Sequence, residues 1–115
     1  MKAIEQYIRA GETRDHDERK RLLEACFAAN GRFVTRSAVL VGPAGVETML
    51  ARFLADPDNL GFRLTSVIDL VGNTFRYSSV VDRKDGTTQE FFDAGELDAD
   101  GKIVTMLVFA GPLQR

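Results

Sequence analysis

One carboxylate in this sequence stands where a purely structural strand gains little from a charge. Asp93 directly follows Phe91 and Phe92 in an apolar, β-prone stretch that continues beyond the turn Asp98-Ala99-Asp100-Gly101. Burial penalises an ionised carboxyl group and raises its pKa, so a desolvated Asp93 would keep its proton and act as an acid or hydrogen-bond donor. The side chains expected to remove it from water are those of Phe91, Tyr77 and Phe109.

A structural role for Asp93 is the alternative, in which the carboxylate pairs with Arg76 or Arg63 or caps a backbone group. Other site chemistries have little support. His16 is the only histidine and lies in a polar helix start, so it predicts a solvated residue, with no metal site and no Ser-His-Asp arrangement. The segment Gly42-Pro43-Ala44-Gly45 lacks the Lys-Ser/Thr of a phosphate loop. We therefore predict no metal, no nucleotide and no other cofactor.

Composition is that of an ordinary globular domain. The 115 residues suffice for one core, and a net charge of −2 with 28% charged and 44% hydrophobic residues shows no basic excess for nucleic acid. The run Arg19-Lys20-Arg21 follows acidic residues and predicts a solvated helix face. Cys26 is the only cysteine, which excludes an internal disulfide. Without an apolar stretch of signal-peptide or membrane-span length, we expect a cytoplasmic protein that binds neither nucleic acid nor membrane.

Three amphipathic helices are predicted in the first half of the chain. The first carries Tyr7 on its apolar face and ends near Gly11. The second begins with Asp15 as N-cap and ends at Asn30-Gly31. The third begins at Gly42-Pro43, where proline suits the first helical turn. Its apolar stripe consists of Val46, Met49, Leu50, Phe53 and Leu54.

Strands make up the rest of the predicted fold. A short strand covers residues 32–35, and four more cover about 62–70, 74–83, 88–97 and 103–110, joined by turns. Helices followed by a meander indicate an α+β domain, with three N-terminal helices packed on one face of a curved antiparallel sheet.

Alternation along residues 74–83 separates the two faces of that sheet. Phe75, Tyr77, Ser79 and Val81 are expected to face the helices, and Thr74, Arg76, Ser78 and Val80 to face outward. Val67 is expected beside Val80 on the outer face. An apolar outer face without helices predicts a symmetric homodimer formed sheet to sheet.

Taken in order, these motifs resemble the nuclear transport factor 2-like superfamily and, within it, the small SnoaL-like domains. The resemblance covers nearly the whole chain and implies a cone, a curved sheet closed by three helices around a deep apolar pocket, commonly as a dimer. Similar proteins include ketosteroid isomerases and polyketide cyclases. The motifs are Arg21-Leu22-Leu23 through Phe27, Gly42-Pro43-Ala44-Gly45-Val46, Thr65-Ser66-Val67-Ile68-Asp69, Phe75-Arg76-Tyr77, and Asp93 through Lys102-Ile103 to Phe109-Ala110-Gly111-Pro112-Leu113.

The resemblance also implies roles for single residues. Asp93 matches the acid that, in the isomerases, stays protonated in an apolar site and donates a hydrogen bond to a developing oxyanion. Tyr7 looks like the tyrosine that shares this duty. Counting from Phe27, the isomerases' general base corresponds to Thr35, which does not take up that proton near neutral pH. Asp69 is the other acid considered for that role, and strand alternation points it away from the pocket.

Two functions are therefore predicted, and the sequence leaves both open. The first is a cofactor-free, isomerase- or cyclase-like enzyme acting on a mostly apolar carbonyl compound, with Asp93 as acid and Tyr7 as second donor. The second is a non-catalytic ligand-binding or dimerisation module that has lost its general base. In either case the residues predicted to line the pocket are Phe91, Tyr77, Phe109, Phe53 and Thr35.

Overall fold

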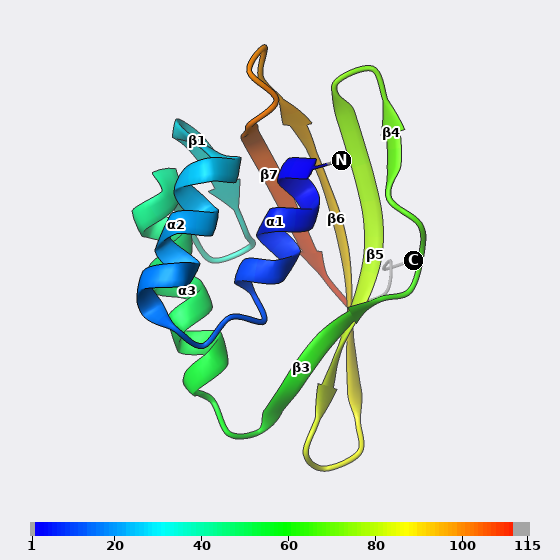
Figure 1. Ribbon diagram of the computed structural model, residues 1–115. Coiled ribbons are helices and arrows are strands. Elements are labelled where there is room, and N and C mark those ends of the chain that lie inside the picture. The colour runs from blue at the N-terminus through cyan, green and yellow to red at the C-terminus, as the bar shows by residue number, and fades with distance from the viewer. Residues whose placement is uncertain (1, 112–115) are drawn as a thin grey trace.

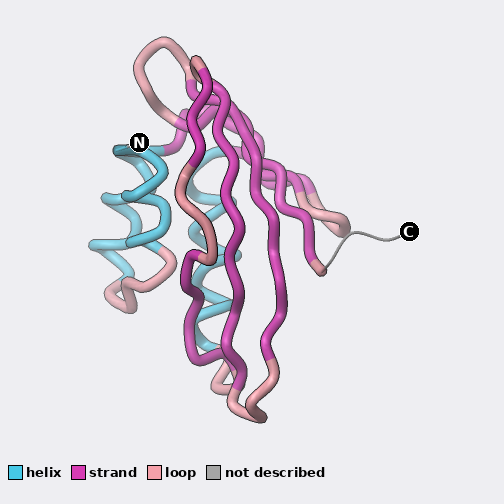
Figure 2. The backbone as a smooth tube through the Cα atoms, turned by 90° about the vertical axis from the view of Figure 1, so that its right-hand side faces the viewer, coloured by secondary structure: helices cyan, strands magenta, loops and turns pink. Residues whose placement is uncertain are grey.

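A computed structural model describes residues 2–111, and the predicted motif residues Pro112 and Leu113 lie outside that range. All the helices lie on one face of a sheet whose long strands curve around them, so the predicted α+β fold is confirmed (Figures 1 and 2). The elements are α1 (Lys2–Ala10), α2 (His16–Cys26), β1 (Phe27–Val34), β2 (Val39–Val41), α3 (Gly42–Ala55), β3 (Asn59–Leu64), β4 (Asp69–Val71), β5 (Thr74–Arg83), β6 (Thr88–Leu97) and β7 (Ile103–Ala110). Within residues 2–111, no helix is long and apolar enough to span a bilayer.

The sheet is mixed rather than wholly antiparallel. Its strands follow the order β2-β1-β7-β6-β5-β3, and β4 pairs with β5 as well. Neighbouring strands are antiparallel except β1 and β7, which run parallel. Because β1 enters the sheet directly after α2 and lies beside the last strand of the meander, a long crossover rather than a hairpin connects the pair.

The second helix ends earlier than its apolar stripe predicts. Asp15 caps it as expected, because its carboxylate accepts a hydrogen bond from the Glu18 N–H at 2.9 Å. The helix stops at Cys26 rather than at Asn30-Gly31. Phe27 has extended backbone and pairs with β7, so strand pairing overrides the local helical pattern.

The predicted strand at 62–70 is divided into β3 and β4. Between them the chain stays tied to β5, since the Thr65 N–H donates to the Ser78 carbonyl at 2.9 Å and the Ser78 N–H donates to the Ser66 hydroxyl at 2.8 Å. The two short strands therefore pair with successive parts of one long strand.

A register shift decides which face of β7 is buried. The pairing of β6 with β7 shifts between Glu96 and Leu97, which leaves an extra residue on β7. The fully buried side chains of β7 are consequently Ile103 and Met106, three positions apart rather than two or four. Beyond the shift the alternation resumes, and Phe109 lies on the outer face with 56% of its surface exposed.

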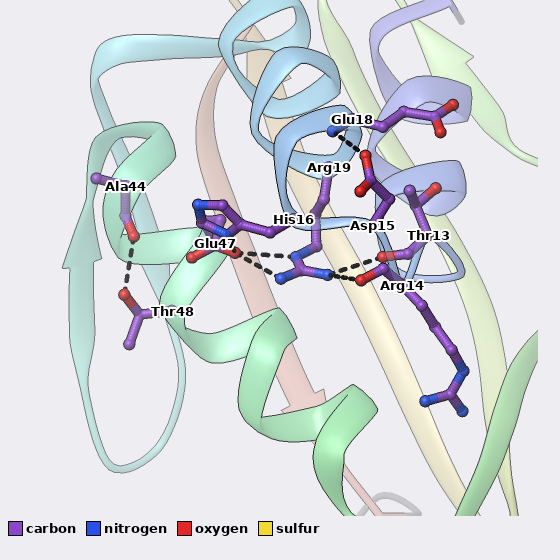
Figure 3. A network of polar contacts seen from close by, with 9 residues as sticks. All are labelled: Thr13, Arg14, Asp15, His16, Glu18, Arg19, Ala44, Glu47 and Thr48. Carbon is purple, nitrogen blue, oxygen red and sulfur yellow. Dashed lines mark hydrogen bonds and ion pairs between the residues drawn. The ribbon is translucent and has the colours of Figure 1, made fainter.

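The predicted solvated face of α2 holds for Lys20 and Arg21 but is wrong for Arg19, which is buried. The Arg19 Nε and Nη2 groups donate to Glu47 Oε1 on α3 at 3.0 and 2.7 Å, and His16 Nδ1 lies 2.9 Å from the same oxygen (Figure 3). Desolvation raises the pKa of Glu47, but hydrogen bonds from Arg19 and His16 outweigh it and lower the pKa below its ordinary value. This cluster joins α2 to α3.

The ring of Phe75 on β5 packs directly on Gly95 of β6, and a substitution at Gly95 tests how close this contact is. A Cβ atom at Gly95 would lie 2.7 Å from Phe75 Cζ and would also overlap the Thr105 carbonyl oxygen. We expect Gly95→Ala to lower the free energy of unfolding by about 3 kcal/mol. The control Gly86→Ala has φ of +87° and open space, and should cost about 1 kcal/mol of backbone strain. Urea denaturation measures both, and equal losses would contradict the close packing.

Candidate functional site

A cavity of about 190 Å³ lies between the helices and the sheet face that they cover. Its wall comes from α1, α3 and strands β1, β3, β5, β6 and β7, and it is mostly aromatic and aliphatic. The polar residues in the wall are Tyr7, Thr35, Ser79 and Asp93. An apolar wall with a few polar groups is the composition typical of small-molecule sites.

Asp93 is 6% exposed and sits within β6, between Tyr77 on β5 and Val108 on β7. Among the described residues, neither Asp93 Oδ1 nor the Tyr77 hydroxyl completes a hydrogen bond. Burial raises the pKa of Asp93 from 3.8 to about 6 and outweighs the lowering by the Tyr77 hydroxyl, which lies near the carboxyl group without reaching hydrogen-bond geometry. Buried polar groups normally have partners, so this pair has unused capacity to bind one.

The structural pairings considered for Asp93 do not form. Arg63 Nε donates to Asp82 Oδ2 at 3.0 Å, and Arg76 Nε donates to Asp69 Oδ2 at 2.9 Å. Both arginines are largely exposed. Asp69 is therefore held in an ion pair outside the cavity wall, as strand alternation predicts.

Tyr7 reaches the cavity from α1, as its place on the apolar stripe predicts. It is buried, and its ring centroid lies 6.0 Å from that of Phe33. Burial, and next the charge of Asp93, raise the pKa of Tyr7 above its ordinary value. Burial raises the pKa of Tyr77 in the same way. Both hydroxyls therefore keep their protons at any working pH and remain hydrogen-bond donors.

Known structures with this arrangement settle the fold. The sequence matches no protein-family model and no curated protein. A candidate isomerase of the SnoaL-like family from Agrobacterium tumefaciens C58 is 25% identical, with a TM-score of 0.84 over 96% of this chain and 95% of that one. An NTF2-like protein of unknown function from Exiguobacterium sp. 255-15 is 20% identical, with a TM-score of 0.70 over 96% and 99%. The chain has the SnoaL-like fold of the nuclear transport factor 2-like superfamily.

The SnoaL-like fold also extends to more distant structures. A protein of unknown function with a cystatin-like fold from Methylobium petroleophilum PM1 is 16% identical, with a TM-score of 0.79 over 99% of this chain and 76% of that one. Because this superfamily holds isomerases and cyclases beside proteins of unknown function, the fold does not assign an activity and the site must supply it.

Within this SnoaL-like fold, Thr35 occupies the cavity wall but is not placed to accept a proton. Its hydroxyl donates to the Ala38 carbonyl at 3.3 Å and accepts from the Ala38 N–H at 3.2 Å, which closes the turn after β1. Neither lysine, histidine nor a second carboxylate belongs to the described part of the wall. Within residues 2–111, no three His, Cys, Asp or Glu side chains gather as a metal site would require.

The other residues predicted to bind ligand divide into two groups. Phe91 and Phe53 line the cavity with Thr35, whereas Tyr77 lies beside Asp93 without forming part of the wall. Phe109 is not brought to the cavity, because the register shift in β7 turns it outward and Val108 takes the inner position. Of the two phenylalanines predicted to flank Asp93, Phe91 lines the cavity and Phe109 does not.

Several lining residues were not singled out from the sequence. Phe33 precedes Thr35 by two positions, so strand alternation alone signals that both face the cavity. Phe62 and Val108 carry no such local signal, because β3 bends and β7 shifts register. They become part of the wall only through the curvature and pairing of the sheet.

The cost of burying Asp93 predicts a pH-dependent stability. Its folded pKa of about 6 lies above the value of 3.8 that an unfolded chain would show, so its contribution to stability is fully present below about pH 4 and is lost as the pH rises through 6. The difference corresponds to about 3 kcal/mol. We expect the stability of Asp93→Asn relative to the wild type to increase by about this amount between pH 4 and pH 8 in urea denaturation.

The exposed turn variant Asp100→Asn controls for the loss of a negative charge as such. A difference between Asp93→Asn and wild type that stays constant with pH would show that Asp93 is not desolvated in the folded protein.

Proposed function

We propose that this protein binds a small, mostly apolar carbonyl compound in the cavity, with Asp93 donating a proton or a hydrogen bond to the carbonyl oxygen. The observation that carries the proposal is the Asp93 carboxyl group, which is buried in an apolar cavity wall without a cation and has one oxygen without a hydrogen-bond partner among the described residues. Tyr7, which reaches the same cavity, is the second donor. Donors fixed in a space of low dielectric stabilise the negative charge that develops on such an oxygen more strongly than water does.

The chemical step follows from the protonation state of Asp93. With its proton, the carboxyl group polarises the carbonyl, which makes the α-protons more acidic; the enol forms only if a base also takes a proton from the α-carbon. With a pKa of about 6, the free protein holds that proton chiefly in weakly acidic solution. A bound apolar ligand replaces water around the carboxyl group and raises its pKa further, which favours the protonated form in the complex.

A non-catalytic binding module is the second candidate, and Thr35 favours it. Thr35, which by the resemblance corresponds to the general base of the isomerases, carries a hydroxyl already used in the turn to Ala38. The described cavity wall offers no other group to remove a proton next to a carbonyl while Asp93 acts as the acid. Binding alone needs only Asp93, Tyr7 and the apolar wall.

The pH dependence of ligand affinity tests the role of Asp93 as donor. If only the protonated form donates to a neutral ketone such as 2-undecanone, the affinity should be highest below pH 6 and should fall about tenfold per pH unit above it. Asp93→Asn keeps a donor that does not titrate, so its affinity should not vary with pH. Titration calorimetry from about pH 5 to about pH 8 measures both. A wild-type affinity that rises with pH would overturn the donor role.

Exchange of α-protons separates enzyme from binding module. If the base is missing, we expect the wild type to incorporate little deuterium into 2-undecanone in D₂O. Thr35→Asp puts a carboxylate into the cavity wall and should raise the rate of incorporation about a hundredfold. Proton NMR of the ketone measures the rate. Rapid exchange by the wild type that Asp93→Asn abolishes would instead show an enzyme in which Asp93 is the base.

We also propose that the outer face of the sheet binds a second copy of the chain. Phe92 and Phe109 are cross-strand partners on this face, 41% and 56% exposed, beside Val80 and a surface hollow of about 590 Å³. Phe109→Glu should convert a dimer to a monomer in analytical ultracentrifugation, because it would bury a charge at the interface. Val41→Glu, at a residue of β2 that is 60% exposed, is the matched control. A wild-type monomer would exclude the interface.

A further inference from the structure

A second space lies beside the cavity and shares a wall with it. This outer hollow, of about 300 Å³, is formed by the loop between α1 and α2, the end of α3 and the start of β3. Phe53 and Phe62 line both spaces, and their rings meet edge to face with centroids 6.4 Å apart. One aromatic pair therefore separates the inner cavity from the outer hollow.

The size of the inner cavity is a reason to consider the two spaces together. At about 190 Å³ the inner cavity falls below the range of roughly 300 to 1,000 Å³ that small-molecule sites usually have. The outer hollow extends it into that range. Phe62 is only half-buried, and its ring packs on Gly11 and Phe53, so a longer ligand that joins the two spaces requires this side chain to turn aside.

The outer hollow has a different chemistry from the cavity. Arg14 lines it, and its Nη1 donates to the Leu54 carbonyl at 3.0 Å, at the C-terminal end of α3. This bond engages one of the five N–H groups of the guanidinium, so others remain to bind a carboxylate through two parallel hydrogen bonds. Glu12 and Asn59 complete the polar part of the lining, and the Asn59 side chain is already bonded to Arg83 and to the Phe53 carbonyl.

The loop that carries Arg14 is fixed by the buried Arg19. The Arg19 Nη1 group donates to the Thr13 carbonyl at 2.9 Å and to the Arg14 carbonyl at 3.2 Å, while its other nitrogens bind Glu47. Figure 3 shows the Arg14 side chain extending away from this cluster while its backbone faces Arg19. A buried charge normally costs stability, and here it holds the backbone of Arg14 against α3.

We propose that the ligand spans both spaces, with its carbonyl end in the inner cavity and an anionic end, a carboxylate, bound by Arg14 in the outer hollow. The carbonyl half rests on the proposed function, whereas the carboxylate half rests on the outer hollow alone. The natural ligand is accordingly an oxo acid with an apolar middle that passes the Phe53–Phe62 pair. Arg19 and Glu47 are positioning residues for the carboxylate.

Matched probes test the carboxylate half. We expect 10-oxoundecanoate to bind the wild type at least tenfold more tightly than its methyl ester, because a charge-assisted bidentate contact is lost in the ester. Arg14→Gln should remove this difference without changing the affinity for 2-undecanone. Arg21→Gln, an exposed arginine of α2 outside the hollow, is the matched control and should leave the difference intact. Equal affinities of acid and ester for the wild type, or a difference that survives Arg14→Gln, would overturn the proposal.

The affinity for 10-oxoundecanoate relative to its methyl ester also tests whether Arg19 and Glu47 position Arg14. Glu47→Gln keeps the shape of the side chain and weakens its hold on Arg19. It should reduce the preference for acid over ester while leaving the affinity for 2-undecanone unchanged, which a general loss of stability would not do. A preserved preference in a folded Glu47→Gln protein would remove Arg19 and Glu47 from the proposal.

Undecanoate, which lacks the ketone, separates failure of this inference from failure of the proposed function. If undecanoate bound as tightly as 10-oxoundecanoate and Arg14→Gln weakened both, the carboxylate site in the outer hollow would stand. The role of Asp93 as a donor to the ketone would then be contradicted. If Arg14→Gln left the affinity for every ketone unchanged, and that affinity still varied with pH through Asp93, the proposed function of the inner cavity would stand. The carboxylate site in the outer hollow would then be contradicted.

Discussion

The desolvation of one carboxyl group by the curved sheet is the constraint on which the site depends. Strands β5, β6 and β7 are closed against the helices at one end, where Phe75 packs on Gly95 and where Ile103 is fully buried. Towards the other end the same strands line a cavity, and Asp93 lies between the two regions. The carboxyl group is therefore held by a strand that is paired on both sides and at the same time faces the cavity.

This arrangement opposes stability near neutral pH. An ionised Asp93 has neither a cation nor a complete set of hydrogen bonds, since the nearby arginines pair with Asp69 and Asp82 on the exposed side. A hydrophobic residue at position 93 would remove the penalty and also the only carboxyl group of the described cavity wall. Residues that cost stability in this way are typical of functional sites, and the well-packed core around Phe75 and Met106 offsets the cost.

Two features of the site bear on what it does with a bound molecule, namely the Thr35 hydroxyl and the outer hollow. The Thr35 hydroxyl bonds to its own turn, so under the proposed function Asp93 and Tyr7 orient a carbonyl oxygen without a partner to remove a proton. The loop before α2 is held by the buried Arg19, which donates to the Thr13 and Arg14 carbonyls. Both observations are consistent with a site built for the shape and the two ends of its ligand.

The sequence by itself determined the three helices apart from the end of the second, the long strands β5, β6 and β7, and the position of the unusual acid, because these depend on local periodicity, capping and turn residues. It also placed Tyr7 and Phe53 correctly on inward helix faces and Asp69 away from the cavity. Only the tertiary structure decided that Phe109 faces outward, since a register shift in a distant part of the hairpin reverses the alternation. In the same way, Phe27 joins a strand because β7 is available to pair with it, and Arg19 is buried because Glu47 comes from another helix. Such contacts link residues far apart in the chain, and no local pattern encodes them.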